Sequence, residues 1–173
     1  MIRFHHHTTF TTFTNLNWLP LLENDQHKNF IIKALRTRVI LEEVSVYGLV
    51  IMPNHIHLIW QLHDGIIRND FQRDFLKYTA KCIIENMKEA NDELLLKCSV
   101  TAPDRKIQIW ERNSLHIEIY SEKILLQKLA YLHNNPISKK WRLTDQPEKY
   151  LWSSASFYET GVDPFGLLTH WRG

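Results

Sequence analysis

The chain has 173 residues and a hydrophobic content of 44%, with six Trp, six Tyr and eight Phe, which predicts one folded domain and excludes a disordered tail. Its two cysteines, Cys82 and Cys98, are too few for a disulfide framework or a four-cysteine zinc site, and they fit a reducing, cytoplasmic setting. A formal net charge of +2 is too small to indicate a nucleic-acid partner by itself.

Apolar residues in the first half of the chain recur with the periods of strands and of helices in turn. Segments rich in β-branched and aromatic residues predict strands at residues 8–14, 44–51 and 55–62. Apolar residues at helical spacing predict a helix from Asp25, its expected N-cap, to about Leu41. The turn Pro53-Asn54 joins the last two strands into a hairpin.

The second half continues this alternation. An apolar stripe predicts a helix over about residues 70–89, with Cys82 as a small core residue. A helix end and a loop are expected over 91–103, and short extended pieces at 106–110 and 116–120. Ser121 is a suitable cap for a further helix, which must end near Asn134-Asn135-Pro136 because proline disfavours helix for the residue before it.

This order of elements predicts an α+β fold. We predict a ferredoxin-like split β-α-β sandwich, with an antiparallel sheet and helices on one face. Its elements follow in the order strand, helix, strand, strand, helix, strand, and an extra helix comes after them. We expect a single domain with a core over about residues 8–136 and a C-terminal extension over about 137–173. No apolar run approaches 18 residues, so no membrane-spanning helix is predicted.

The most informative pattern is a pair of histidines at the start of the second hairpin strand. Side chains on a strand alternate between its faces, so His55 and His57 share one face while the apolar residues between and after them face the core. Two imidazoles side by side can bind one metal ion. Such a pair also arises by chance, and a lone histidine is usually structural or exposed, so the spacing alone leaves this open. Residues His5 to His7 could also bind a metal ion, although we expect them to be a solvent-exposed segment ahead of the first strand.

A second set of polar residues lies on the last predicted helix. Gln127, Tyr131 and Asn135 step by four and share one face, away from the leucines. A phenol can attack phosphorus if nearby cations or a metal ion help it to ionise, and an amide oxygen can be a third metal ligand. A helical tyrosine is more often a packing residue. Tyr78, which two lysines flank, is a rival nucleophile.

Positive charge gathers around the same helix. Five basic residues and no acidic residue occur between Lys123 and Thr144, a pattern that indicates a phosphate-rich partner. A second cluster on the helix before it is diluted by acidic neighbours. The basic residues of the two clusters that we expect to contact such a partner are Arg68, Arg73, Lys77, Lys81, Lys128, Lys139, Lys140 and Arg142.

Four stretches of the chain together resemble the HUH-type single-tyrosine transposases, in particular their REP-associated branch. They are Val50–Ile59, Phe75–Lys81, Tyr131–Pro136 and Trp152–Ser154, in the order of the family. The resemblance implies a ferredoxin-like domain that cuts and rejoins single-stranded DNA beside hairpins through a 5′-phosphotyrosine, without a nucleotide cofactor. By match, His55 and His57 would bind Mg²⁺ or Mn²⁺, Tyr131 would be the nucleophile, and Asn135 would complete the metal site.

Other interpretations stay open beside this one. A domesticated protein could keep the fold and bind hairpin DNA without cutting it, and a purely structural metal protein would need no DNA. Under the transposase interpretation the basic residues contact DNA, and Trp110, Trp141 and Trp152 are candidates for stacking on splayed bases. Both a monomer and a homodimer fit, in a cytoplasmic, nucleoid-associated bacterial protein.

Overall fold

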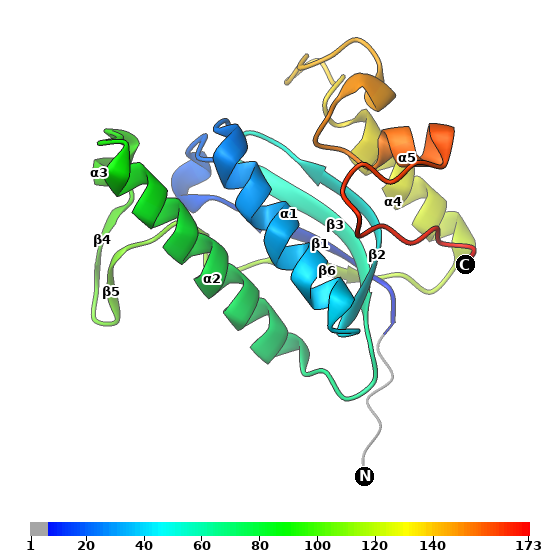
Figure 1. Cartoon of the computed structure of the whole chain (residues 1–173), viewed down its shortest axis with the longest axis horizontal. Coiled ribbons are helices and arrows are strands. Elements are labelled where there is room, and N and C mark those ends of the chain that lie inside the picture. Colours follow the sequence, from blue (N-terminus) through cyan, green and yellow to red (C-terminus); the bar gives the residue numbers. More distant parts are fainter. Residues whose placement is uncertain (1–6) are drawn as a thin grey trace.

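A four-stranded antiparallel sheet forms the centre of the molecule (Figure 1). Its strands lie in the order β2-β3-β1-β6, with bounds β1 (Thr9–Thr14), β2 (Val44–Ile51), β3 (His55–Leu62) and β6 (Leu115–Glu118). One face is covered by α1 (Asp25–Ile40) and α2 (Arg68–Glu89), and the other carries α4 (Glu122–Asn134). This order confirms the predicted ferredoxin-like sandwich with an extra late helix.

The alternation along β3 divides the interior into two clusters. Ile56, Leu58 and Trp60 pack with α1 and α2 in the larger cluster. Ile59 points the opposite way and joins the leucines of α4 in the smaller one. Because His55 and His57 have the same parity as Ile59, their side chains lie on the α4 side, as the sequence pattern predicts.

The helix α4 is held close to the sheet by its cap and by a glycine below it. The Ser121 side chain accepts a hydrogen bond from Ile124 N, which confirms the predicted cap. The pairing of β2 with β3 shifts register between Val46 and Gly48, a β-bulge. A Cβ on Gly48 would lie 2.8 Å from Leu129 Cδ1, so the absence of a side chain there lets α4 approach β2.

The C-terminal extension lies along the outer edge of β2 (Figure 1). Ser154 N donates to Leu49 O at 2.8 Å, and Thr169 N donates to Val46 O at 2.9 Å. The Ser154 hydroxyl oxygen also accepts from Leu49 N at 3.0 Å and hydrogen-bonds His133 Nε2 at 2.8 Å. The extension therefore ties α4 to the sheet that it covers.

Several details differ from the sequence-based expectations. Asn24, not Asp25, caps α1, because the Asn24 side chain accepts from Gln26 N. Cys82 is only half-buried, since it lies one position off the buried stripe of α2, whereas Cys98 is buried. The sequence predicts a helix end and a loop over residues 91–103 and a short extended piece at 106–110. The structure has a short helix here, α3 (Leu94–Lys97), followed by a hairpin of β4 (Ser99–Ala102) and β5 (Arg105–Ile107). The hairpin forms because the two strands pair antiparallel and satisfy backbone hydrogen bonds of one another.

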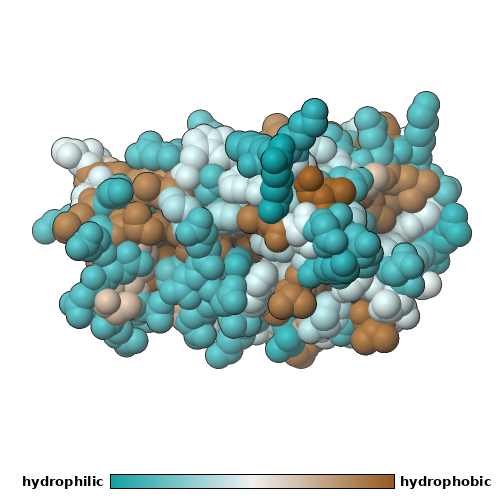
Figure 2. Space-filling model, turned by 90° about the horizontal axis from the view of Figure 1, so that it is seen from above, coloured by the Kyte–Doolittle hydropathy of each residue, from teal (hydrophilic) through white to brown (hydrophobic). Residues whose placement is uncertain are grey.

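The remaining elements are short. They are two 3-10 helices, η1 (Leu16–Trp18) and η2 (Pro147–Lys149), and α5 (Ala155–Thr160). Seen from above, hydrophilic side chains cover most of the surface and hydrophobic ones gather at the end that carries α3 (Figure 2). The computed structural model describes residues 7–173, so His5 and His6 lie outside the described residues. Within that range no helix has the length and apolar character to cross a membrane.

Candidate active site

A cavity of about 590 Å³ lies between the strand β3 and the helix α4. Its lining comes from β1, η1, β3, α4 and the segment after α4: Thr12, Trp18, His55, His57, Gln127, Ala130, Tyr131, Asn134, Asn135, Ser138, Lys140 and Trp141. None of these described residues is acidic. Imidazole, amide, hydroxyl and ammonium groups surround the space, and such a lining favours an anionic ligand.

The two imidazoles are fixed by hydrogen bonds that leave their outer nitrogens available. His55 Nδ1 donates to Asn54 Oδ1 at 2.7 Å, so its Nε2 carries the lone pair. His57 Nδ1 hydrogen-bonds Thr12 Oγ1 at 2.8 Å, and the buried His57 Nε2 has no hydrogen-bond partner among the described residues. The ring centroids lie 4.6 Å apart. A buried nitrogen without a partner, beside a second imidazole, fits a metal ligand.

Burial keeps both imidazoles neutral at pH 7. It lowers the pKa of His55 to about 4, with a further contribution from the positive charge of Lys140. It lowers the pKa of His57 to about 3, aided by His55 and then by Lys128. Neutral imidazole is the form that coordinates metal ions.

Tyr131 faces this histidine pair from α4. Its ring centroid lies 5.3 Å from that of His57 and 5.9 Å from that of Phe10. The side chain is 52% exposed, so Tyr131 is not a core packing residue. Gln127 and Asn135 line the same cavity, which confirms that the three residues share one face of the helix. The structure thus brings together the predicted nucleophile and all three predicted metal ligands, and their roles stay predictions.

The candidate metal site would have few ligands from the protein. Within residues 7–173 no cluster of three or more His, Cys, Asp or Glu residues could hold a metal ion. Two imidazole nitrogens and the amide oxygen of Asn135 would leave coordination positions for oxygens of a ligand. An open coordination sphere is typical of catalytic metal sites, whereas structural sites are closed.

Comparison with known proteins places this arrangement in a transposase fold. No family model and no curated protein matches the chain. A solved structure of a REP-associated tyrosine transposase bound to a REP hairpin superposes with a TM-score of 0.64 at 17% identity, covering 98% of this chain and 89% of that one. The chain has the fold of this REP-associated tyrosine transposase. A second neighbour, a candidate transposase from Deinococcus radiodurans R1, has a TM-score of 0.49 at 15% identity and covers 76% of this chain and 92% of that one.

Two of the predicted DNA-contacting lysines lie beside the cavity of this transposase fold. Lys128 Nζ is 4.9 Å from the centroid of the Phe10 ring, next to His57. Lys140 Nζ is 5.5 Å from the Trp18 ring and 5.2 Å from the Trp141 ring. Lys139 and Arg142 are exposed on the same segment after α4. These four predicted residues can therefore belong to one surface.

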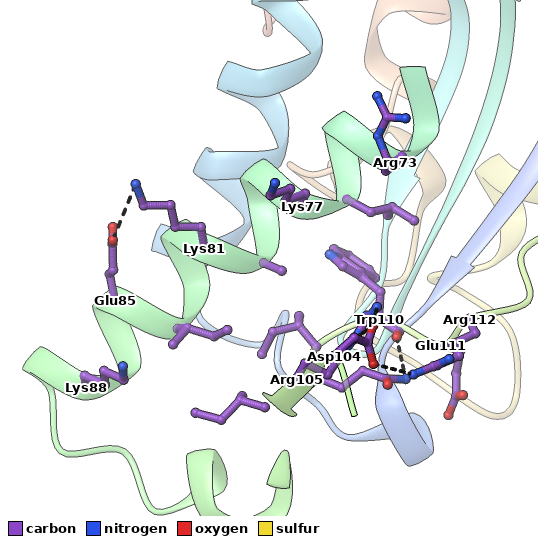
Figure 3. A pocket seen from close by; sticks show the side chains of 16 residues that line it. Arg73, Lys77, Lys81, Glu85, Lys88, Asp104, Arg105, Trp110, Glu111 and Arg112 are labelled. Atoms are coloured by element: carbon purple, nitrogen blue, oxygen red, sulfur yellow. Dashed lines mark hydrogen bonds and ion pairs between the residues drawn. The ribbon is translucent and has the colours of Figure 1, made fainter. Parts of the chain in front are cut away.

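The four predicted residues on α2 do not join that surface. Arg73, Lys77 and Lys81 line a separate groove of about 660 Å³ between α2 and residues 104–112 (Figure 3). Acidic neighbours already pair with two of these cations: Arg73 with Asp70 and Asp74 at 2.7 and 2.9 Å, and Lys81 with Glu85 at 3.9 Å. Arg68, at the start of α2, lies 3.4 Å from Glu118. The fold therefore places the two predicted basic clusters on separate surfaces.

The other aromatic candidates also separate by location. Tyr78 lies on α2, outside the lining of the cavity, and a hydrogen bond with Cys82 raises its pKa, which disfavours a nucleophilic role. Trp110 is 5% exposed and donates from Nε1 to Thr79 Oγ1 at 3.1 Å. Trp152 packs against the larger cluster, with Lys28 over its ring. Of the three predicted stacking residues, only Trp141 lines the cavity.

Sequence reasoning missed three residues of this site. Thr12 could have been found, because it alternates on β1 with residues of the core. Asn54 stands within the histidine motif, yet its role in orienting His55 needs the folded turn. Trp18 lies in an irregular segment that has no periodic signal, so nothing in the sequence places it beside the histidines.

Proposed function

We propose that the chain is a metal-dependent single-strand DNA nickase and strand transferase, a transposase that cuts and rejoins DNA beside hairpins. One observation carries the proposal: two neutral imidazoles of β3 and an exposed phenol of α4 line one cavity without a carboxylate. The transposase fold supports it, and the similar structure holds a REP hairpin.

The proposed reaction is a transesterification at phosphorus. The Tyr131 hydroxyl oxygen attacks the scissile phosphate, and its proton passes to water. The bond between phosphorus and the 3′ oxygen breaks, and that oxygen leaves as a 3′-hydroxyl after it takes up a proton. The DNA stays attached to Tyr131 through a 5′-phosphotyrosine, which conserves the bond energy. The reverse attack by a 3′-hydroxyl rejoins the strand, so no nucleotide cofactor is needed.

The residues of the cavity fit a divalent ion. His55 and His57 would hold it through Nε2, and Asn135 would add its amide oxygen. When bound, Mg²⁺ or Mn²⁺ would polarise the scissile phosphate and neutralise charge in the transition state. Imidazole ligands favour Mn²⁺ over Mg²⁺, which prefers oxygen. Lys128 and Lys140 supply further positive charge for the flanking phosphates.

A cleavage assay tests the proposal. A labelled hairpin oligonucleotide with a single-stranded flank is incubated with the chain and Mn²⁺, and a parallel sample contains EDTA. We expect a covalent protein–DNA band on a denaturing gel with Mn²⁺ and none with EDTA. Tyr131→Phe should lose that band and keep hairpin binding, whereas Tyr78→Phe should keep both. A covalent band retained by Tyr131→Phe would assign the nucleophile elsewhere.

A second candidate is a protein of the same fold that binds hairpin DNA without cutting it. The complete set of His55, His57, Tyr131 and Asn135 around one cavity argues against this alternative. It predicts salt-dependent hairpin binding by the wild-type chain but no covalent product with any divalent ion. A structural metal protein would instead bind Mn²⁺ and show no salt-dependent DNA affinity.

A further inference from the structure

Trp18 is the most exposed of the six tryptophans, at 57%, and it forms part of the rim of the cavity. Trp60 and Trp110 are buried, and the other three are only partly exposed. An indole combines a large flat apolar surface with few rotatable bonds. A surface of this kind, left open beside a polar cavity, is suited to a planar ligand.

The backbone that carries Trp18 is held in an unusual conformation. Asn17 and Trp18 both have left-handed dihedrals, with φ of 52° and 57°, which side-chain-bearing residues rarely adopt. Hydrogen bonds from the surroundings fix them: Asn17 N donates to Glu111 Oε1 at 2.7 Å, and Trp18 N donates to Asn15 O at 3.0 Å. Strain of this kind persists only where the structure enforces it, and it concentrates at binding sites.

A single side chain connects Trp18 to the histidine pair. The Asn54 amide donates from Nδ2 to Trp18 O at 3.2 Å, and its Oδ1 accepts from His55 Nδ1 at 2.7 Å. The rings of Trp18 and His55 lie 6.0 Å apart, inclined at 72°. The position of the indole is therefore fixed relative to the His55 imidazole, which would hold the metal ion at the scissile phosphate.

An ammonium group lies next to the indole. Lys140 Nζ is between Trp18 and Trp141, 5.5 and 5.2 Å from the two ring centroids, and it has no ion pair among the described residues. Trp141 in turn lies 5.8 Å from His55. An exposed aromatic ring beside a free cation is the combination by which proteins bind single-stranded nucleic acid, since the ring stacks on a base and the cation binds a phosphate.

We propose that Trp18 stacks on one unpaired DNA base adjacent to the scissile phosphate and that Lys140 binds the phosphate of that nucleotide. This inference rests on the proposed function and adds the position at which the strand is held. The alternative occupant is a second copy of this chain that covers the indole. The positive charge and the absence of acidic residues in the lining favour a nucleic acid strand over such a copy.

The test measures binding in EDTA, so that it does not depend on cleavage. The probe is a hairpin oligonucleotide with a single-stranded flank, compared with versions that carry one abasic site at each flank position in turn. We expect Trp18→Ala to bind the intact probe about 5- to 150-fold more weakly, the range for loss of one stacked base. Trp18→Phe should keep most of the affinity. Tyr120→Ala, which removes an exposed aromatic ring outside the cavity, is the matched control.

The abasic series identifies the stacked base. At one flank position the wild-type chain should lose affinity to the same extent as Trp18→Ala, and there the variant should lose nothing more, because both changes remove one contact. A less than twofold effect of Trp18→Ala overturns the proposal. So does a loss that is equal on every abasic probe, or a wild-type dimer in sedimentation that Trp18→Ala dissociates.

The outcomes separate this inference from the proposed function. If the wild-type chain cleaves DNA and Trp18→Ala binds normally, only the stacking proposal fails. If no cleavage occurs and the base-specific loss is still observed, the stacking proposal stands and the catalytic one fails. Circular dichroism melting of each variant checks that it is folded.

Discussion

Substitution of Gly48 by alanine tests whether the close packing of α4 on β2 determines the geometry of the cavity. The new Cβ would lie 2.8 Å from Leu129 Cδ1 and 3.3 Å from Leu132 Cδ2. Carbon atoms in a packed interior lie about 3.5–4.0 Å apart. Both leucines are buried, so neither can turn toward solvent. Either α4 moves away by about 1 Å or the leucines adopt strained rotamers.

The expected effect on the free energy of unfolding follows from two opposing contributions. Overpacking of a core costs about 1–3 kcal/mol, and the reduced entropy of the unfolded chain offsets about 0.4–1 kcal/mol of it. A net loss of about 1–2 kcal/mol lowers the Tm of a domain of this size by about 2–8 °C. A displacement of about 1 Å at a reacting group can slow a reaction about 100-fold. We therefore expect Gly48→Ala to lower the rate of DNA cleavage much more than it lowers the affinity for the hairpin.

Thermal unfolding and covalent-complex formation, measured on the same preparations, check this prediction. Leu129→Val is the matched second change, because it removes the δ carbon that the new methyl group would meet. The double variant should be less destabilised than the sum of the two single variants, with a coupling energy of about 0.5–3 kcal/mol. A Gly48→Ala variant with a Tm equal to or above that of the wild-type chain would refute the reasoning.

Three further predictions address the metal site, the basic surface and the interior. Asn54→Ala releases the Nδ1 of His55, so Mn²⁺ affinity should fall about 10- to 100-fold by calorimetry; unchanged affinity would mean that the amide does not orient the ring. Lys140→Ala should weaken DNA binding and lower its salt slope by about 1, whereas Arg73→Ala, whose cation is already paired, should change neither in salt-titrated binding assays. Burial lowers the pKa of His133 to about 4, below the unfolded value of about 6.5. The unfolded state therefore takes up the proton first, and stability that is fully present above about pH 6.5 should decline as the pH falls toward 4, by roughly 3 kcal/mol for this group. Denaturant unfolding at several pH values should show a shallower decline in His133→Gln, and identical slopes would exclude this group as the source.

The parts of the fold that could be predicted are those in which apolar residues recur with the period of a strand or a helix. The alternation along β3 assigns His55 and His57 to one face without any knowledge of the partner helix. The spacing of Leu125, Leu129 and Leu132 fixes which side of α4 is buried, and therefore that Tyr131 lies on the other side. Each inference depends on local geometry, which the sequence determines directly.

The parts of the site that could not be predicted depend on contacts between segments that are distant in the sequence. The left-handed backbone at Asn17 and Trp18 depends on two distant residues: the Glu111 carboxylate accepts from Asn17 N, and the Asn54 amide donates to Trp18 O. The pairing of Arg73 with Asp70 has helical spacing and could have been predicted, and it would have argued against a DNA contact there. The hairpin of β4 and β5 is too short for a periodic signal.

The outer edge of β2 has a consequence for self-association. An uncovered edge strand offers a row of unpaired amide and carbonyl groups to any neighbouring chain. Here Leu49 and Val46 already pair with Ser154 and Thr169, so another molecule cannot lengthen the sheet from that side. Removal of the last two dozen or so residues would unmask a ready template for intermolecular β-pairing, and such a shortened chain should aggregate under conditions in which the full chain does not.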